Sequence, residues 1–321
     1  CQLIGDYGPT SLVSWSRGVF SCGLRRYMAG FCRSSVAASK HAGKRALRVR
    51  LTFRKPIASG AKSFTALAVM RLVEDGVLRL DDPVRRFLGD DLPLIDDAVT
   101  VEHLLTHTSG IGDYLDEEAD WDVDNYVLPV PVHLLGETEA FVPVLDGSPQ
   151  AFAPGGRFAY CNGGYVVLAL VAERASGRGY HALVEQEVCA RAGLEATGFP
   201  RSDDLPADVA LGYLDAEGNR SNVLHLPVRG SGDGGICTSA GDLHRFWRAF
   251  LGGRIVSPET VAEMIRPRHD VPAEGMRYGM GFWLHGTGSA LVMEGYDPGV
   301  SFRSTHDPAT ATTVSVLGNS S

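Results

Sequence analysis

A serine and a lysine three residues apart, Ser59 and Lys62, are of the types that nucleophilic catalysis requires. They open the segment SGAKSFTALAVMRLVEDG, which predicts one helix from Ser59 to Gly76 with Ser59 as its cap. Residues three apart share a helical face, so the lysine amine can reach the serine hydroxyl. A serine attacks well only after a neighbouring base has removed its proton, and a neutral lysine amine can do this. The pair therefore indicates acyl-transfer chemistry.

The distribution of basic residues favours a special role for Lys62. The chain has four lysines, and every Lys or Arg after Lys62 is an arginine, which stays protonated and cannot act as a base. A Ser three positions before a Lys also arises by chance, and a lysine that extends to solvent from a helix start is the simpler alternative.

The helix that begins with this pair is predicted to cross the middle of a large core, because residues 64–70 are apolar almost all round. The residues from 111 to 150 are rich in Asp and Pro and are predicted to form a loop. Further helices are predicted at 100–107, 164–175, 240–251 and 258–264, and antiparallel strands in the segments YGMGFWL, ALVME and TTVSVL.

Two other patterns are interpreted as structural. His103 and His107 have a spacing that can bind a metal ion, but the sequence shows neither H-E-x-x-H nor a third ligand, so packing roles are favoured. The glycine-rich loop at 230–235 matches neither common phosphate-binding pattern. We therefore expect no metal and no cofactor.

Composition describes a globular chain with an unusual start. Of its 321 residues 44% are apolar, and no apolar run is long enough to cross a membrane. Six cysteines without compact spacing are expected to be free thiols. Residues 1–56 carry eleven Lys or Arg against one acid, Asp6, but without interleaved aromatic residues, so we expect no nucleic-acid partner.

The start of the chain also bears on its domains and location. Residues 1–56 show no regular period and are predicted to be an unassigned segment, either disordered or not native to the fold; residues 57–321 form the expected domain. No signal peptide is recognisable, which favours a cytoplasmic location. A lipidated Cys1 and a chain that is a fragment are the alternatives.

Five segments in order resemble the serine β-lactamase and penicillin-binding-protein superfamily, and in particular its class C branch: IASGAKSFTA, LLTHTSGIGDY, PGGRFAYCNGGY, GDGGICTSAGDL and YGMGFW. That branch includes D-alanyl-D-alanine carboxypeptidases, D-aminopeptidases and β-lactamase-like esterases. The resemblance covers residues 57–318 and implies an α/β (α+β) fold. An antiparallel sheet flanked by helices would carry an all-helical lobe at about 77–234, with the site in the cleft between them. The strands that usually precede the serine helix are not apparent in residues 1–50.

The resemblance also implies the site residues. Ser59 would be the nucleophile, Lys62 the adjoining base and Tyr160 a second proton-transfer group, while Asn162 would contact the acyl part of the substrate.

The third motif of the family, Lys or His, any residue, Gly, corresponds to Met293-Glu294-Gly295. The glycine is present and the cation is not, and Arg303 is the nearest candidate replacement. The backbone N–H groups of Ser59 and Tyr296 would bind the carbonyl oxygen of the substrate.

These features predict a serine hydrolase that acts through an acyl-enzyme on a small-molecule ester, amide or peptide, as a β-lactamase-like esterase or a D-amino-acid peptidase. The absent cation predicts a preference for uncharged esters over carboxylate-bearing β-lactams. One alternative is a catalytically impaired protein that uses the same fold for binding or regulation, and a metal-dependent hydrolase is a third class.

Overall fold

The structure is a computed structural model that describes residues 2–5, 53–115, 128–215 and 218–320. Most of the segment 1–56, including Cys1, Cys22 and Cys32, lies outside these residues, so the proposed division at residue 56 stays a prediction. The described cysteines, Cys161, Cys189 and Cys237, are buried free thiols, as expected.

A seven-stranded antiparallel sheet forms one end of the molecule, in the order β1-β9-β8-β7-β6-β5-β4. Its strands are β1 (Gln2–Gly5), β4 (His269–Val271), β5 (Met276–Tyr278), β6 (Trp283–His285), β7 (Leu291–Asp297), β8 (Val300–Asp307) and β9 (Thr312–Gly318). In β8 every second side chain is buried, beginning with Val300, because these side chains face the helices.

The strands at the start of the chain differ from the prediction. Gln2–Gly5 pairs antiparallel with β9, although the sequence there has no strand-like alternation. A second, two-stranded sheet joins β2 (Lys55–Pro56) to β3 (Cys237–Thr238) and anchors the entry to the serine turn. Both strands owe their place to partners more than 180 residues away in the sequence, which local patterns cannot reveal.

The helices lie mainly on one face of the sheet and beyond it. They are α2 (Ala61–Glu74), α3 (Arg85–Leu88), α4 (Val101–Leu105), α5 (Val142–Leu145), α6 (Asn162–Ser176), α7 (Tyr180–Val184), α8 (Ala240–Leu251) and α9 (Pro258–Met264). The bounds of α8 and α9 agree with the prediction. Short 3₁₀ turns at Val132–Leu134 and Thr138–Phe141 precede α5 in the predicted loop, and a π-helical turn, Glu185–Ala190, follows α7.

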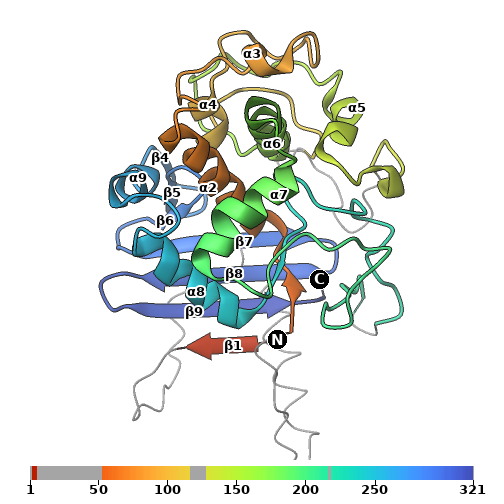
Figure 1. The fold of residues 1–321 in the computed structure, drawn as a ribbon, viewed down its shortest axis with the longest axis vertical. Helices are drawn as coiled ribbons and strands as arrows, with labels where there is room; N and C mark the ends of the chain where they lie inside the picture. The colour runs from red at the N-terminus through yellow and green to blue at the C-terminus, as the bar shows by residue number, and fades with distance from the viewer. Residues whose placement is uncertain (1, 6–52, 116–127, 216–217, 321) are drawn as a thin grey trace, which may run out of the picture.

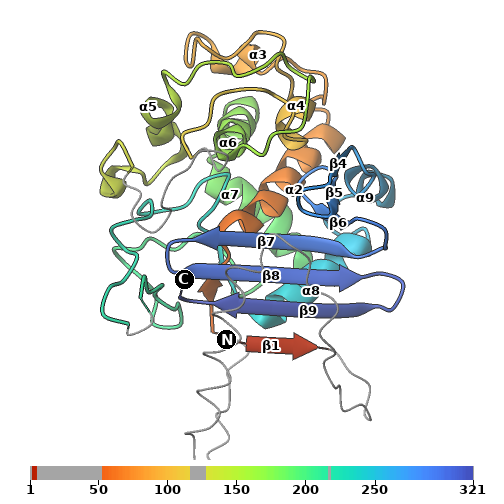
Figure 2. The same cartoon turned by 180° about the vertical axis from the view of Figure 1, so that it is seen from behind.

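Helix α2 is the central element, as its apolar sequence predicts. It runs from the sheet to the helices α3 to α6 at the other end of the molecule (Figure 1). Eleven of its fourteen residues are buried. In the view from behind, β7, β8 and β9 lie in front of α8, so α8 covers the opposite face of these strands (Figure 2). The indole N–H of Trp247 on α8 donates to Ser304 Oγ on β8 at 2.8 Å and ties the two layers together.

Candidate active site

Ser59 lies in a 3₁₀ turn, Ala58–Gly60, that leads directly into α2. The sequence-based expectation that Ser59 caps the helix is wrong, because Gly60 is the N-cap and no side chain caps this end. The turn begins at Ala58 with a φ of 46°, a left-handed conformation that costs free energy in a residue other than glycine. Because the Ser59 hydroxyl is not used as a helix cap, it can take part in chemistry.

The Lys62 amine has three hydrogen-bond partners, one in the serine turn, one in α6 and one in the glycine-rich loop. Its amine nitrogen lies 2.8 Å from Ser59 Oγ, 2.8 Å from Asn162 Oδ1 and 3.0 Å from the carbonyl oxygen of Asp233. Both carbonyl oxygens can only accept hydrogen bonds. An ammonium group can donate one N–H to each of the three oxygens, and all three hydrogen bonds run in this direction. Once the group has lost one proton, its two remaining N–H groups can stay with the two carbonyls while the lone pair faces the serine hydroxyl. This arrangement suits the removal of a proton from Ser59.

Asn162 is the first residue of α6, and its orientation is set by the chain around residue 113. Its side-chain N–H donates to the carbonyl of Leu115 at 3.1 Å, which directs Oδ1 at Lys62. The Asp113 carboxylate accepts the backbone N–H groups of Asn162 at 2.6 Å and Gly163 at 2.8 Å. Burial raises the pKa of Asp113 to about 6, against the effect of these hydrogen bonds.

Asp233 is a second buried carboxylate beside Lys62. Its backbone carbonyl binds the lysine amine, and its side chain accepts a hydrogen bond from the hydroxyl of Tyr114 at 2.5 Å. Burial raises the pKa of Asp233, and burial together with the nearby acid raises the pKa of Tyr114 well above its usual value. The phenol is therefore a fixed donor that holds the glycine-rich loop against the lysine.

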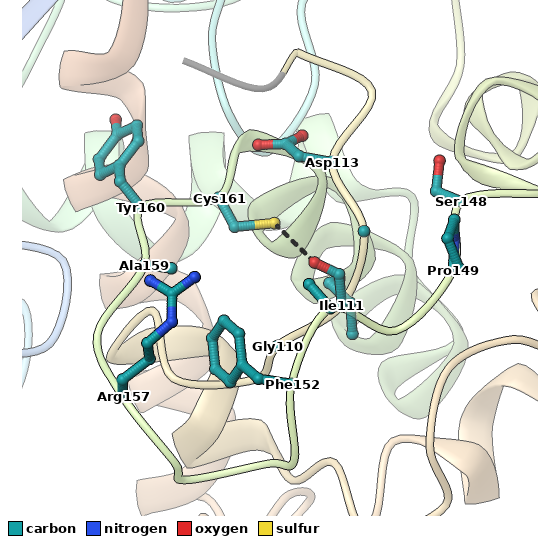
Figure 3. Close-up of a pocket in the computed structure, with 12 residues that line it drawn as sticks. Gly110, Ile111, Asp113, Ser148, Pro149, Phe152, Arg157, Ala159, Tyr160 and Cys161 are labelled. Atoms are coloured by element: carbon teal, nitrogen blue, oxygen red, sulfur yellow. Dashed lines mark hydrogen bonds between the residues drawn. The ribbon is translucent and has the colours of Figure 1, made fainter. Parts of the chain in front are cut away.

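Tyr160 lies next to Lys62. The lysine nitrogen is 5.0 Å from the centre of its ring, and the ring stacks on Trp283 of β6 with centres 6.0 Å apart. Below the turn that carries Tyr160 is a cavity of about 280 Å³ between residues 110–113, 148–152 and 157–161. In Figure 3 the Tyr160 ring points away from Arg157 and Phe152 at the lower end of this cavity.

The opposite side of the site is the edge of β7 after Val292, where its pairing with β6 ends. A Cβ atom at Gly295 would lie 2.5 Å from both the backbone nitrogen of Ser59 and the carbonyl oxygen of Ile57. Only glycine allows this approach. It brings β7 against the serine turn at the place where the resemblance puts the N–H groups of Ser59 and Tyr296.

The structure corrects two expectations about the third motif: that Met293 lies at the substrate, and that Arg303 replaces the absent cation. Met293 has 1% of its surface exposed and packs in the hydrophobic core, so its side chain does not line the cleft. Glu294 and Arg303 are opposite each other on β7 and β8 and form an ion pair at 3.3 Å. Alternation along β7 places them on the sheet face opposite to Gly295. Arg303 is therefore not a replacement for the absent cation.

The two histidines of the predicted metal spacing have separate structural positions. His103 takes part in a capping box with Thr100 at the start of α4, and His107 is buried beside Tyr160. Among the described residues, no group of three or more His, Cys, Asp and Glu side chains could hold a metal ion. Within the same part of the chain, no helix is both long and apolar enough to cross a bilayer.

A model of the β-lactamase family matches residues 29–321. The chain belongs to the β-lactamase family. Its match begins upstream of residue 57, where the motifs alone placed the start of the resemblance. The fold agrees with that of the family: a crystal structure of a penicillin binding protein from Bacillus halodurans superimposes with a TM-score of 0.79 at 37% identity and covers 87% of this chain and 86% of that one.

Two curated relatives in the family carry different names. Esterase EstB of Burkholderia gladioli is 33% identical over 279 residues, which are 78% of this chain and 70% of the esterase. Penicillin-binding protein 4* of Bacillus subtilis is 29% identical over 277 residues, which are 80% of this chain and 58% of that protein.

Sequence reasoning missed two buried carboxylates of the site, Asp113 and Asp233, and for His107 it favoured a packing role without naming Tyr160 as its neighbour. The signal for each was present, because they lie in the segments LLTHTSGIGDY and GDGGICTSAGDL that carry the resemblance. Their contacts with Lys62, Asn162 and Tyr160 depend on the tertiary fold, which no local spacing describes.

Proposed function

We propose that the protein is a serine hydrolase that cleaves uncharged carboxylic esters through an acyl-enzyme on Ser59. The observation that carries this proposal is the set of three partners of Lys62. One backbone carbonyl and one side-chain amide carbonyl accept from the lysine amine, and the third partner is the serine hydroxyl. A lysine held in this way can act as the general base for its neighbour.

The proposed reaction begins with proton transfer from Ser59 Oγ to Lys62 Nζ and attack of the oxygen on the ester carbonyl. The tetrahedral intermediate would place its negative oxygen between the N–H groups of Ser59 and Tyr296. Collapse of the intermediate breaks the bond to the alcohol, which leaves with a proton relayed through Lys62 and Tyr160. Water then transfers a proton to the Lys62 amine as it attacks the acyl carbonyl. The bond to Ser59 Oγ breaks and Oγ takes this proton, which releases the acid and restores the serine.

The preference for uncharged esters is supported by the third motif. A buried methionine stands where the family has a Lys or His, and the nearby arginine is paired on the other sheet face. A substrate carboxylate would thus lose a charge-assisted contact worth about 1.5–3 kcal/mol, or roughly ten- to a hundredfold in binding. Neutral esters lose nothing. Short-chain p-nitrophenyl esters should therefore be hydrolysed faster than nitrocefin.

A fluorophosphonate probe tests the proposal directly. Mass spectrometry of the labelled peptide should place the label on Ser59, and Ser59→Ala should abolish both labelling and ester hydrolysis. Ser63→Ala is the matched control, because its hydroxyl is buried and donates to the carbonyl of Gly281 at 2.6 Å. A probe-resistant wild-type protein would support the binding or regulatory alternative instead.

A further inference from the structure

His107 follows α4 and contacts the chain on both sides of Tyr160. Its backbone carbonyl accepts the N–H of Ala159 at 2.9 Å, and its ring nitrogen Nδ1 accepts the N–H of Cys161 at 3.1 Å. The imidazole also lies against the Tyr160 ring, with centres 4.4 Å apart and planes 31° from parallel. Three contacts from one residue thus fix the backbone and the ring of the tyrosine beside Lys62.

The ring of His107 is held in one form. Nδ1 must keep its lone pair to accept the Cys161 N–H, so the proton of the neutral ring is on Nε2. Burial and the charge of Lys62 lower the pKa of His107 well below its usual value, which keeps the ring neutral. A protonated ring would lose the acceptor and release the turn.

The position of His107 is unfavourable in two respects. Its φ is 56°, a left-handed conformation that a residue with a Cβ adopts at a cost. Its Nε2 is buried with no hydrogen-bond partner among the described residues. Unfavourable features of this kind collect at functional sites, where the surrounding structure enforces them.

We propose that His107 is a positioning residue: it holds the Tyr160 ring against Lys62 by binding the backbone on both sides of that tyrosine. His107 does not contact the substrate. The inference rests on the proton-transfer role given to Tyr160 under the proposed function, and the experiment below separates the two.

The test compares His107→Gly with His107→Asn. Both residues tolerate the left-handed backbone, but only asparagine has an oxygen near the position of Nδ1. We expect His107→Gly to lower kcat on p-nitrophenyl butyrate by about ten- to a hundredfold with little change in KM, because proton transfer is misaligned while binding is not. His107→Asn should recover most of this loss.

Two further variants give the test its controls. His103→Asn changes a histidine of the same helix segment that only caps α4, and it should leave kcat unchanged. If His107→Gly does not fold, His107→Gln replaces it, since its amide oxygen reaches the position of Nε2 and not that of Nδ1; it should be as slow as expected for glycine.

A double-mutant cycle with Tyr160→Phe decides the mechanism. If His107 acts through Tyr160, His107→Gly should cost far less in the Tyr160→Phe background than in the wild type. An equal loss in both backgrounds, or no recovery in His107→Asn, would overturn the inference and leave the proposed function intact. Full ester hydrolysis by Ser59→Ala would overturn the proposed function and the role of His107 together.

Discussion

The two sides of the candidate active site are built in different ways. The helical wall, residues 160–163 at the start of α6, is held by buried polar groups: Asp113 binds two of its N–H groups and His107 a third. The sheet wall, residues 293–296 of β7, is held by close backbone contact at Gly295 and by an apolar side chain, Met293.

The difference separates proton transfer from charge recognition. The helical wall contains many buried polar atoms, and these orient both Lys62 and Tyr160. The sheet wall keeps the approach to Ser59 that an oxyanion site requires, but its ion pair, Glu294 with Arg303, lies on the far face. Bond cleavage and recognition of a substrate carboxylate can therefore vary independently in this fold.

The largest expected effect is that of Lys62→Arg. A guanidinium cannot accept a proton from Ser59, so kcat/KM for esters should fall by about 10³-fold or more while the helix remains folded. Ester kinetics and thermal unfolding of the same preparation measure both quantities. A variant with near wild-type activity would show that the contacts of Lys62 are structural. The helical wall would then have no special role in proton transfer.

Gly295→Ala tests the sheet wall. The added methyl group would lie 2.5 Å from the Ser59 nitrogen, so β7 and the serine turn must move apart. We expect a fall in kcat of about 10²–10³-fold, the usual cost of one oxyanion donor. Gly179→Ala is the control, because a Cβ there meets nothing within 4 Å. Equal activity of the two variants would contradict a role for β7 in binding the oxyanion.

Asp113→Asn tests how much stability the buried carboxylate of the helical wall costs as the pH changes. The pKa of Asp113 is raised to about 6 in the folded protein, above its unfolded value near 4. Its contribution to stability is therefore complete below about pH 4 and is lost as the pH rises through 6, by up to about 3 kcal/mol.

The measurement for Asp113 is the difference in Tm between the wild type and Asp113→Asn from pH 4 to pH 8. The wild type should lose stability relative to the variant as the pH rises. Asp97→Asn, which changes an exposed aspartate, is the matched control. A constant difference for Asp113→Asn would mean that this carboxylate does not titrate in the range that its burial implies.

Met293→Lys has the smallest expected effect and sharpens the comparison. Position 293 is on the same sheet face as Gly295, so a longer side chain could extend its ammonium toward the cleft. The ratio of nitrocefin to ester hydrolysis should rise by roughly tenfold, with a lower Tm because a core side chain is replaced. An unchanged ratio would show that the cation alone does not determine the ester preference.

The sequence predicted the elements that local patterns define. The apolar helix that follows Ser59, the bounds of α8 and α9 and the strands at ALVME and TTVSVL agree with the structure. The segment YGMGFWL instead covers the connection between β5 and β6, and β8 was not predicted. The family motifs also placed Ser59, Lys62 and Asn162 together, and their hydrogen bonds are present.

What the sequence could not provide were the non-local arrangements. The pairing of β1 with β9 joins the two ends of the described chain, and it has no local signature. The face on which Arg303 lies depends on the register between β7 and β8, and one residue of slip would have reversed it. The burial of Met293 depends likewise on packing around it.

The N-cap of α6 is a thiol, Cys161, whose sulfur accepts the N–H of Gly164 at 3.3 Å. Burial raises the pKa of this thiol well above its usual value, so it stays protonated and resists alkylation while the helix start is closed. Because the same residue adjoins both Tyr160 and Asn162, the rate at which iodoacetamide inactivates the protein would report how often the catalytic turn opens. Alkylation of Cys161 would therefore measure local unfolding of the catalytic turn.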